Sequence, residues 1–240
     1  MAWNNHRGAV SLTFDDGLRN QIEVALPLMK SYDIQGTFFL IQHPPAPYSP
    51  DFDELAWKKA VAVGNEIGSH SVSHRKASSL NPDQAYIEAR DSKIHFEKVF
   101  GRTVTSFCYP YTDCPAHLVT AVKKAGYSAA RAGRGAREEK LISAGDKVNP
   151  LTLPAVHVGE SLFADGTIWT YIDEAISRNA WVTFMLHAVG ASPEELGTPL
   201  GWDNVTAASF EKLMQVLSDR KKKNGLWVAP FGEVARHLRK

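Results

Sequence analysis

The sequence predicts an α/β fold in which short parallel strands alternate with helices and close into a barrel. Apolar segments rich in β-branched and aromatic residues recur along the chain, and segments with helical periodicity separate most of them. Polar side chains of catalytic types stand at the ends of several apolar segments. At 240 residues the chain is close to the size of one βα barrel, so we expect a single domain over residues 1–240.

The expected elements alternate over most of the chain. We expect strands at residues 9–14, 35–41, 66–69, 104–109, 127–131, 151–158, 181–186 and 226–229. We expect helices at residues 20–32, 53–63, 81–100, 115–125, 167–178, 206–223 and 231–240. Pro27 is expected to kink or divide the first helix, and the glycine-rich segment 133–149 is expected to form a mobile loop over the site.

Composition and charge exclude several classes of protein. The formal net charge is +1, and the basic residues are scattered apart from residues 220–223, which argues against a nucleic-acid-binding protein. No apolar run approaches the roughly 20 residues that span a bilayer. Residues 1–7 contain no apolar signal core, which leaves an intracellular protein and a processed secreted one both open. Cys108 and Cys114 are spaced for one small-loop disulfide, and the sequence does not decide whether they pair.

Two adjacent carboxylates, Asp15 and Asp16, follow the first expected strand directly. Like charges this close raise one pKa unless a cation holds both groups ionised. The carboxyl ends of parallel strands are where α/β folds gather ligands and catalytic groups. The sequence Asp-Asp-Gly is equally typical of a turn that caps the next helix. A role in cation binding therefore depends on what else reaches this edge of the sheet.

Histidines supply that second observation. His70 and His74 follow the third expected strand four residues apart, a spacing that on a helical turn projects both imidazoles from one face. Together with a strand-end aspartate they supply two nitrogens and one oxygen and leave positions open for water, which suits catalytic zinc. His187 ends the expected strand 181–186, so a further strand end carries a proton-transfer group.

These motifs resemble a known family. The stretch 13–17 (TFDDG), the stretch 70–74 (HSVSH) and Met-Leu-His at 185–187 have the order and separations of the polysaccharide deacetylases, the NodB homology domain of carbohydrate esterase family 4. Each motif alone is weak, whereas the ordered set is specific. The resemblance implies a distorted (β/α)7-type barrel. It implies that Asp15 is the catalytic base and His187 the general acid. It assigns the metal, Zn²⁺ or another ion such as Co²⁺ or Ni²⁺, to Asp16, His70 and His74.

The third motif of the family departs from its usual pattern here. The family sequence Arg-Pro-Pro-Tyr-Gly corresponds to Cys-Tyr-Pro-Tyr-Thr at 108–112, so Cys108 replaces the arginine that pairs with the base. Tyr111 matches the residue whose backbone N–H completes the oxyanion site. We expect Arg131, at the end of the neighbouring strand, to pair with Asp15 instead, although a salt bridge with a surface acid explains Arg131 equally well. The fourth motif, an Asp beside Trp that orients the general-acid histidine, has no clear match.

The resemblance implies a metal-dependent hydrolase that removes acetyl groups from a carbohydrate. The expected substrate contacts are Tyr109, Pro110, Leu186 and Trp202, of which the aromatic rings can stack on pyranose rings. N-deacetylation of an amino-sugar polymer or oligomer is favoured, because it describes more of the family. O-deacetylation of acetylated xylan and hydrolysis of a small non-sugar amide stay open. A non-catalytic carbohydrate-binding protein is disfavoured, because such a copy has no reason to keep the whole set of catalytic-type residues.

Overall fold

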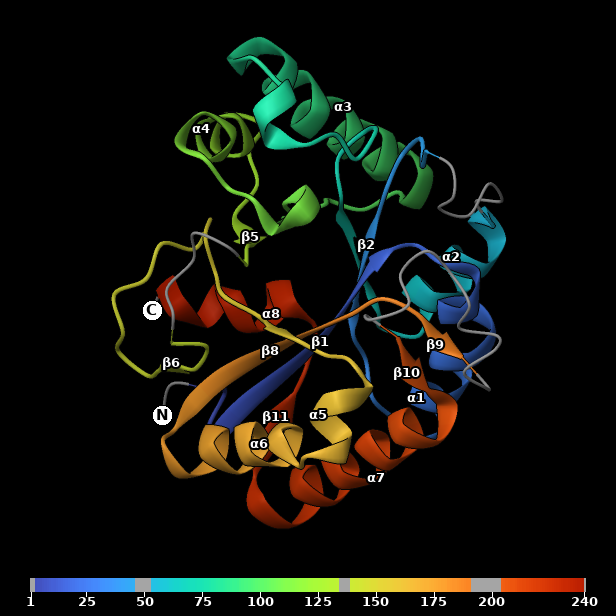
Figure 1. Ribbon diagram of the computed structural model, residues 1–240, viewed down its shortest axis with the longest axis vertical. Helices are drawn as coiled ribbons and strands as arrows, with labels where there is room; N and C mark the ends of the chain where they lie inside the picture. The colour runs from blue at the N-terminus through green and yellow to red at the C-terminus, as the bar shows by residue number, and fades with distance from the viewer. Residues whose placement is uncertain (1–2, 46–52, 134–138, 191–203, 240) are drawn as a thin grey trace.

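The computed structural model describes residues 3–45, 53–133, 139–190 and 204–239 (Figure 1). In this part of the chain, nine strands form one curled sheet, and helices surround it, which confirms the expected distorted barrel. The strands are β1 (Gly8–Asp16), β2 (Thr37–Leu40), β3 (Glu66–Ser69), β4 (Ser106–Cys108), β5 (Ala129–Arg131), β6 (Ile142–Ser143), β7 (Val156–His157), β8 (Ala180–Leu186), β9 (Val189–Gly190), β10 (Val205–Thr206) and β11 (Leu226–Val228). The α-helices are α1 (Leu26–Ser31), α2 (Glu54–Ala62), α3 (Pro82–Phe100), α4 (Ala116–Lys124), α5 (Glu160–Ala164), α6 (Thr167–Ser177), α7 (Ala207–Asn224) and α8 (Phe231–Ala235).

Strand β1 is the centre of the sheet. It pairs in parallel with β8 on one edge, and with β11 and then β2 along the other. The order continues from β2 through β3 and β4 to β5. All nine residues of β1 are buried, as its apolar, β-branched sequence predicts for a strand covered on both faces. The strand that carries the two aspartates is therefore firmly fixed.

The barrel closes through the segment 150–157, which runs between β5 and β8. Leu153 N donates to Ala130 O at 2.9 Å, and Ala132 N donates to Leu153 O at 2.8 Å, so this segment first bonds to β5. Three residues later it pairs with β8 as the two-residue strand β7. The expected strand 151–158 is thus mostly irregular, because its first residues bond to β5 and only its later residues pair with β8. This change of partner strand distorts the barrel.

Several local structures differ from the expectations. The first helix is divided before Pro27: residues 21–25 form a π-helical turn, and α1 follows with Pro27 in its first turn, where a missing N–H costs little. Strands β6, β9 and β10 and helix α5 are too short to leave a periodic signal, and the sequence did not predict them. The segment expected to be a mobile loop contains β6 and lies partly outside the described residues.

Aromatic packing anchors the end of β1. The Phe14 ring stacks on Phe38 of β2 with centroids 4.7 Å apart and meets the edge of Phe210 of α7 at 5.9 Å. Such rings bury large apolar areas and prefer these geometries. Phe14 immediately precedes Asp15, so this packing fixes the backbone from which the first carboxylate projects.

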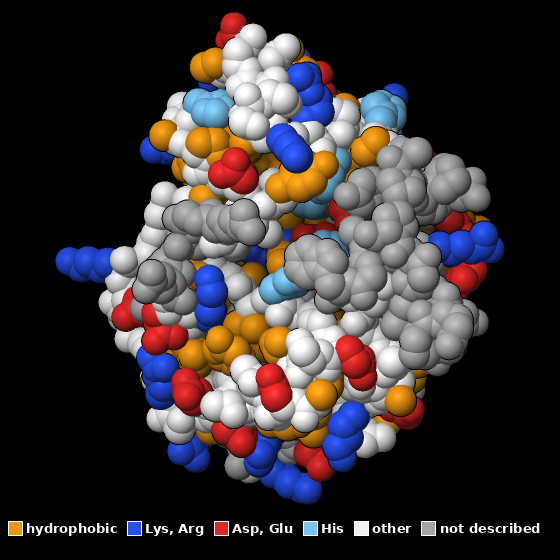
Figure 2. All heavy atoms as spheres, in the orientation of Figure 1, with side chains coloured by type: hydrophobic (Ala, Val, Ile, Leu, Met, Phe, Trp, Pro, Cys, Tyr) orange, Lys and Arg blue, Asp and Glu red, His pale blue; other side chains and the backbone are white. Residues whose placement is uncertain are grey.

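The carboxyl ends of the parallel strands meet at one mouth of the barrel. Asp15 and Asp16 end β1, His70 follows β3, Arg131 ends β5 and His187 follows β8. Figure 2 shows histidine and acidic side chains at depth in a hollow near the centre of the face. Among the described residues, no helix is long and apolar enough to cross a membrane.

Candidate active site

Three side chains converge on one point at this mouth: Asp16, His70 and His74. The Nε2 atoms of the two histidines are 3.2 Å apart, and Asp16 Oδ1 lies 3.5 Å from His70 Nε2 and 3.6 Å from His74 Nε2. Ligand atoms about 2.1 Å from a tetrahedral zinc ion are roughly 3.4 Å from one another. The three atoms therefore fit three corners of a tetrahedral site, and all three side chains are buried.

Burial prepares both imidazoles to act as ligands, and a hydrogen bond orients that of His70. His70 Nδ1 lies 2.9 Å from the carbonyl oxygen of Cys108, which can only accept, so Nδ1 carries the proton and Nε2 presents its lone pair to the site. Burial lowers the pKa of His70 to about 4 and that of His74 to about 3. Both rings are neutral at neutral pH, which is the state that binds metal. The donor set fits a divalent cation such as zinc.

The loop that carries these histidines is not the helical turn expected from their spacing. Ser71 and His74 have left-handed backbone conformations, with φ of 71° and 53°. Ser71 Oγ accepts a hydrogen bond from His74 N at 3.0 Å and closes a tight turn. The imidazoles converge because the backbone folds back on itself. The four-residue spacing therefore predicted the two histidines that meet, but the helical turn expected to bring them together is absent from this loop.

Asp15 is buried beside the same point and is paired with Arg131. Arg131 Nη2 donates to Asp15 Oδ2, and both side chains are almost fully buried. Burial raises the pKa of Asp15, but the charges of Arg131, His70 and His187 outweigh it and bring that pKa down to about 2. Asp15 is therefore ionised at neutral pH. The pairing expected for Arg131 is present in the structure.

Cys108, which replaces the motif arginine, lies against this ion pair. Its Sγ is 3.6 Å from Asp15 Oδ2, and Arg131 also contacts the sulfur. Asp15, His70 and Cys108 are close enough together to be a second possible set of metal ligands. Burial raises the pKa of the Cys108 thiol far above its usual range, because the apolar surroundings disfavour the thiolate. No disulfide joins Cys108 to Cys114.

His187 faces the two aspartates from the other side. Its Nε2 atom lies 3.8 Å from Asp15 Oδ2 and 4.0 Å from Asp16 Oδ2, and its side chain is slightly exposed. A proton-transfer group and a buried carboxylate thus border one small space. The ring of His157, at the end of β7, packs edge-on against the His187 ring with centroids 5.8 Å apart.

A model of the polysaccharide deacetylase family matches residues 3–130, more than half of the chain and all the residues of its first three motifs. The chain belongs to the polysaccharide deacetylase family. It is 28% identical over 95 residues to a peptidoglycan-N-acetylglucosamine deacetylase of Bacillus cereus, covering 39% of this chain and 42% of that protein. It is 24% identical over 250 residues to a gellan lyase of a Bacillus species, covering 96% of this chain and 9% of that protein. The chain thus spans less than half the length of these curated relatives.

The fold of this family member also matches solved structures. A Mycobacterium smegmatis protein assigned to the polysaccharide deacetylases superposes with a TM-score of 0.70 at 15% identity, covering 98% of this chain and 91% of that one. At this identity the likeness shows the fold alone. It agrees with the distorted barrel described above.

Gln21 is a residue of this deacetylase-family site that the sequence did not indicate. It is fully buried in the π-helical turn after β1. Its Nε2 donates to the backbone carbonyls of Asp15 at 2.6 Å and His187 at 3.0 Å. One amide therefore joins the ends of β1 and β8. A glutamine in an amphipathic segment carries no signal of this, because its partners lie in two separate strands.

The residues expected to contact substrate differ in their exposure. Tyr111 is 47% exposed, and its ring lies 4.7 Å from that of His74, at the rim of the site. Tyr109 and Leu186 were expected to contact substrate, but both are fully buried in the hydrophobic core, and Tyr109 donates its hydroxyl to Leu151 O at 2.9 Å. Pro110 is also buried. Direct contact of these three residues with a substrate stays a prediction. Trp202 lies outside the described residues.

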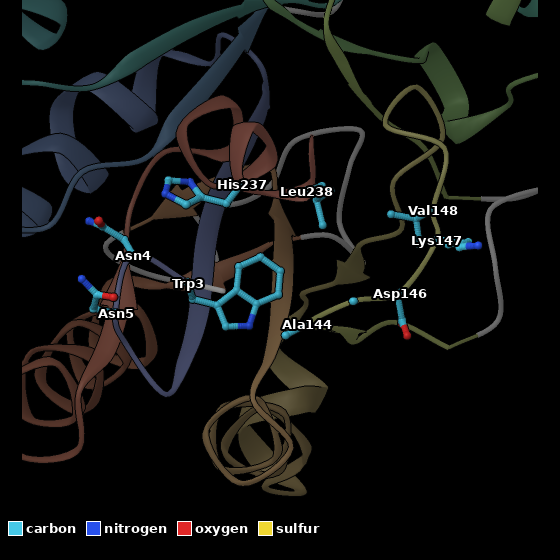
Figure 3. A pocket seen from close by; sticks show the side chains of 10 residues that line it. Trp3, Asn4, Asn5, Ala144, Asp146, Lys147, Val148, His237 and Leu238 are labelled. Carbon is cyan, nitrogen blue, oxygen red and sulfur yellow. The ribbon is translucent and has the colours of Figure 1, made fainter. Parts of the chain in front are cut away.

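Two other features lie apart from the catalytic geometry. Glu160, the first residue of α5, accepts a hydrogen bond from Thr206 N at 2.9 Å and fixes the start of α7. A pocket of about 850 Å³ lies near the start of β1, between the chain start, the loop after β6 and the C-terminal turn (Figure 3). Its lining includes Trp3, Lys147 and His237 and none of the site residues. It lies at the amino end of β1, where barrel residues commonly serve stability.

Proposed function

We propose that this chain is a metal-dependent deacetylase that hydrolyses acetyl groups from an N-acetylated amino-sugar polymer or oligomer. One observation carries the proposal: an ionised carboxylate, a metal-type ligand set and a histidine border the same space. Asp15 stands beside the triangle of Asp16, His70 and His74, and His187 Nε2 lies within 4.0 Å of both aspartates. Single motifs of these types occur in many structural settings, whereas their meeting at a barrel mouth is typical of an active site.

The residues divide the reaction between them. A divalent metal bound by Asp16, His70 and His74 would polarise the acetyl carbonyl and lower the pKa of its water ligand. Asp15 accepts a proton from water as the water oxygen adds to the acetyl carbon. Arg131 keeps that carboxylate ionised and fixes its direction. His187 donates a proton to the amine nitrogen as the C–N bond breaks, and acetate and a free amine leave.

The rim of the site supports a carbohydrate substrate. Tyr111 exposes its ring beside His74, and Lys76 Nζ lies 5.5 Å from the centre of that ring. An exposed aromatic ring at the edge of a hollow is a surface on which a pyranose can stack. The N-acetyl preference rests on the relative named for peptidoglycan N-acetylglucosamine. The backbone N–H of Tyr111 is the oxyanion donor that the family resemblance implies.

Acetate release from a substrate panel tests the proposal. The panel contains chitin-type oligosaccharides, peptidoglycan fragments, acetylated xylan and a small acetylated amide, each assayed with the wild-type chain and with Asp15→Asn. We expect acetate and an equal amount of free amine from the amino-sugar members with the wild-type chain alone. Release from xylan alone would move the assignment to O-deacetylation. No release from any member would contradict the proposal.

A further inference from the structure

The loop that carries the two histidine ligands has a backbone that its own sequence does not favour. Ser71 and His74 both adopt left-handed conformations, which residues with a Cβ rarely adopt. Backbone strain of this kind persists only where the surroundings impose it. A group outside the tight turn is therefore needed to hold this loop in place.

Glu88 of α3 is that group. Its side chain is buried and points at the middle of the loop, between the two histidines. Glu88 Oε2 accepts hydrogen bonds from Val72 N at 3.0 Å and from Ser73 N at 2.9 Å, and Glu88 Oε1 accepts from Ser73 Oγ at 2.5 Å. One carboxylate thus satisfies three donors of two consecutive loop residues.

The helix that presents Glu88 is itself firmly held. Asn81 and Gln84 form a reciprocal capping box at the start of α3. One turn beyond Glu88, Ser92 Oγ lies 2.7 Å from Ser69 Oγ at the end of β3, and Ser69 Oγ accepts from Ser71 N at 3.2 Å. The loop is therefore fixed at its start through Ser69 and at its middle through Glu88.

We infer that Glu88 is a positioning residue that holds the loop 70–74 in its metal-binding shape before a metal arrives. The inference rests on the proposed metal site. A preorganised loop spends no binding free energy on ordering its ligands, so its metal affinity is higher. The carboxylate matters because glutamine offers one acceptor oxygen, and its NH₂ group would face a loop donor. Hydrogen-bond partners of this kind around metal ligands are typically worth 10–100-fold in affinity.

Zinc affinity measured by competition with a chromogenic chelator tests the inference without using activity. The variants are Glu88→Gln, Ser73→Ala and, as a control that removes the same charge from the same helix, Asp91→Asn. Asp91 is partly exposed and pairs with Arg90. We expect Glu88→Gln to bind zinc roughly 10–100-fold more weakly than the wild type. We expect a smaller loss in Ser73→Ala, which removes one of the three hydrogen bonds and no charge, and none in Asp91→Asn.

Circular dichroism of the metal-free proteins confirms that each variant compared is folded. Unchanged affinity in Glu88→Gln would overturn the inference, and so would a loss in Glu88→Gln with none in Ser73→Ala, because charge alone would then explain it. If Glu88→Gln does not fold, Ser73→Ala decides the question. A wild-type chain that binds no zinc would overturn the inference and the metal site together. Glu88-dependent zinc binding without acetate release would overturn only the proposed function.

Discussion

Arg131 and Asp15 form a buried ion pair across the barrel, although three strands separate β5 from β1 in the sheet. The curvature of the sheet brings their carboxyl ends together, and the Arg131 side chain is 1% exposed. The Arg131 guanidinium also lies over the Phe39 ring, 5.4 Å from its centre. Arg131 thus supplies from β5 the cation that the family motif places at position 108.

The pH profile of an Arg131→Met variant tests this pairing. Removing the cation raises the pKa of Asp15, because burial then acts with less opposition. A neighbouring cation typically lowers a carboxylate pKa by ~1–3 units, so the acidic limb of kcat/KM should move to higher pH by about that amount. Zinc affinity should change little. An acidic limb that stays in place in the folded variant would show that Arg131 does not set the protonation of Asp15.

The same pair should contribute to stability with a defined pH dependence. The pKa of Asp15 is about 2 in the folded chain, below its ordinary value of 3.8, so folding is favoured by the ionised form. This contribution is present above pH 3.8 and is lost as the pH falls toward 2. Urea unfolding of the wild type and of Asp15→Asn between pH 6 and pH 2 measures it. The stability difference between the two should shrink at the acid end, and a constant difference would contradict the pairing.

Asp15→Asn is also expected to separate catalysis from metal binding. Asparagine keeps the size of the side chain but cannot accept a proton, so turnover should fall by at least the ~10²–10⁴-fold typical of a general base. Zinc content should stay the same, because Asp15 is not one of the three converging ligands. If the variant kept more than about a tenth of the wild-type kcat, a loss of only ~1.4 kcal/mol, Asp15 would not be the base.

Gln21→Met tests the link between the strand ends of β1 and β8. Methionine fills a similar volume but leaves the carbonyls of Asp15 and His187 without their buried donor. An unsatisfied buried polar group costs ~1–3 kcal/mol, so the free energy of unfolding should fall by about that amount. We expect kcat to fall more than KM rises, because the proton-transfer groups move relative to each other. Gln35→Met, at a partly exposed position, serves as the control. Equal effects of the two substitutions would refute a specific role for Gln21.

The sequence was sufficient to predict the residues that stand at strand ends. Asp15, Asp16, His70, His187 and Arg131 each end or follow an apolar strand, and parallel strands bring such positions to one edge. This rule needs only the strand pattern and no knowledge of the side-chain directions. The strand pattern therefore predicted both the α/β barrel and the residues that meet at its mouth.

Residues whose role depends on a distant contact could not be predicted in this way. Glu88 and Gln21 look like ordinary residues of amphipathic segments, and only the packing of α3 and of the π-helical turn gives them buried partners. Tyr109 is the opposite case: as an aromatic residue in a functional motif it resembles a sugar contact, and the structure packs its ring in the core against Phe107. The left-handed backbone of the histidine loop also has no signal in a stretch without glycine.

Acetate release before and after metal removal tests the central claim most directly. The chain is assayed on N-acetylated amino-sugar oligomers as prepared, after chelator dialysis to a metal content verified by elemental analysis, and after addition of Zn²⁺. His74→Ala, which removes one of the three converging ligands, is assayed beside it. We expect activity to disappear with the metal, to return in the wild type with about one zinc per chain, and not to return in His74→Ala. Full acetate release by a verified metal-free chain would contradict the account.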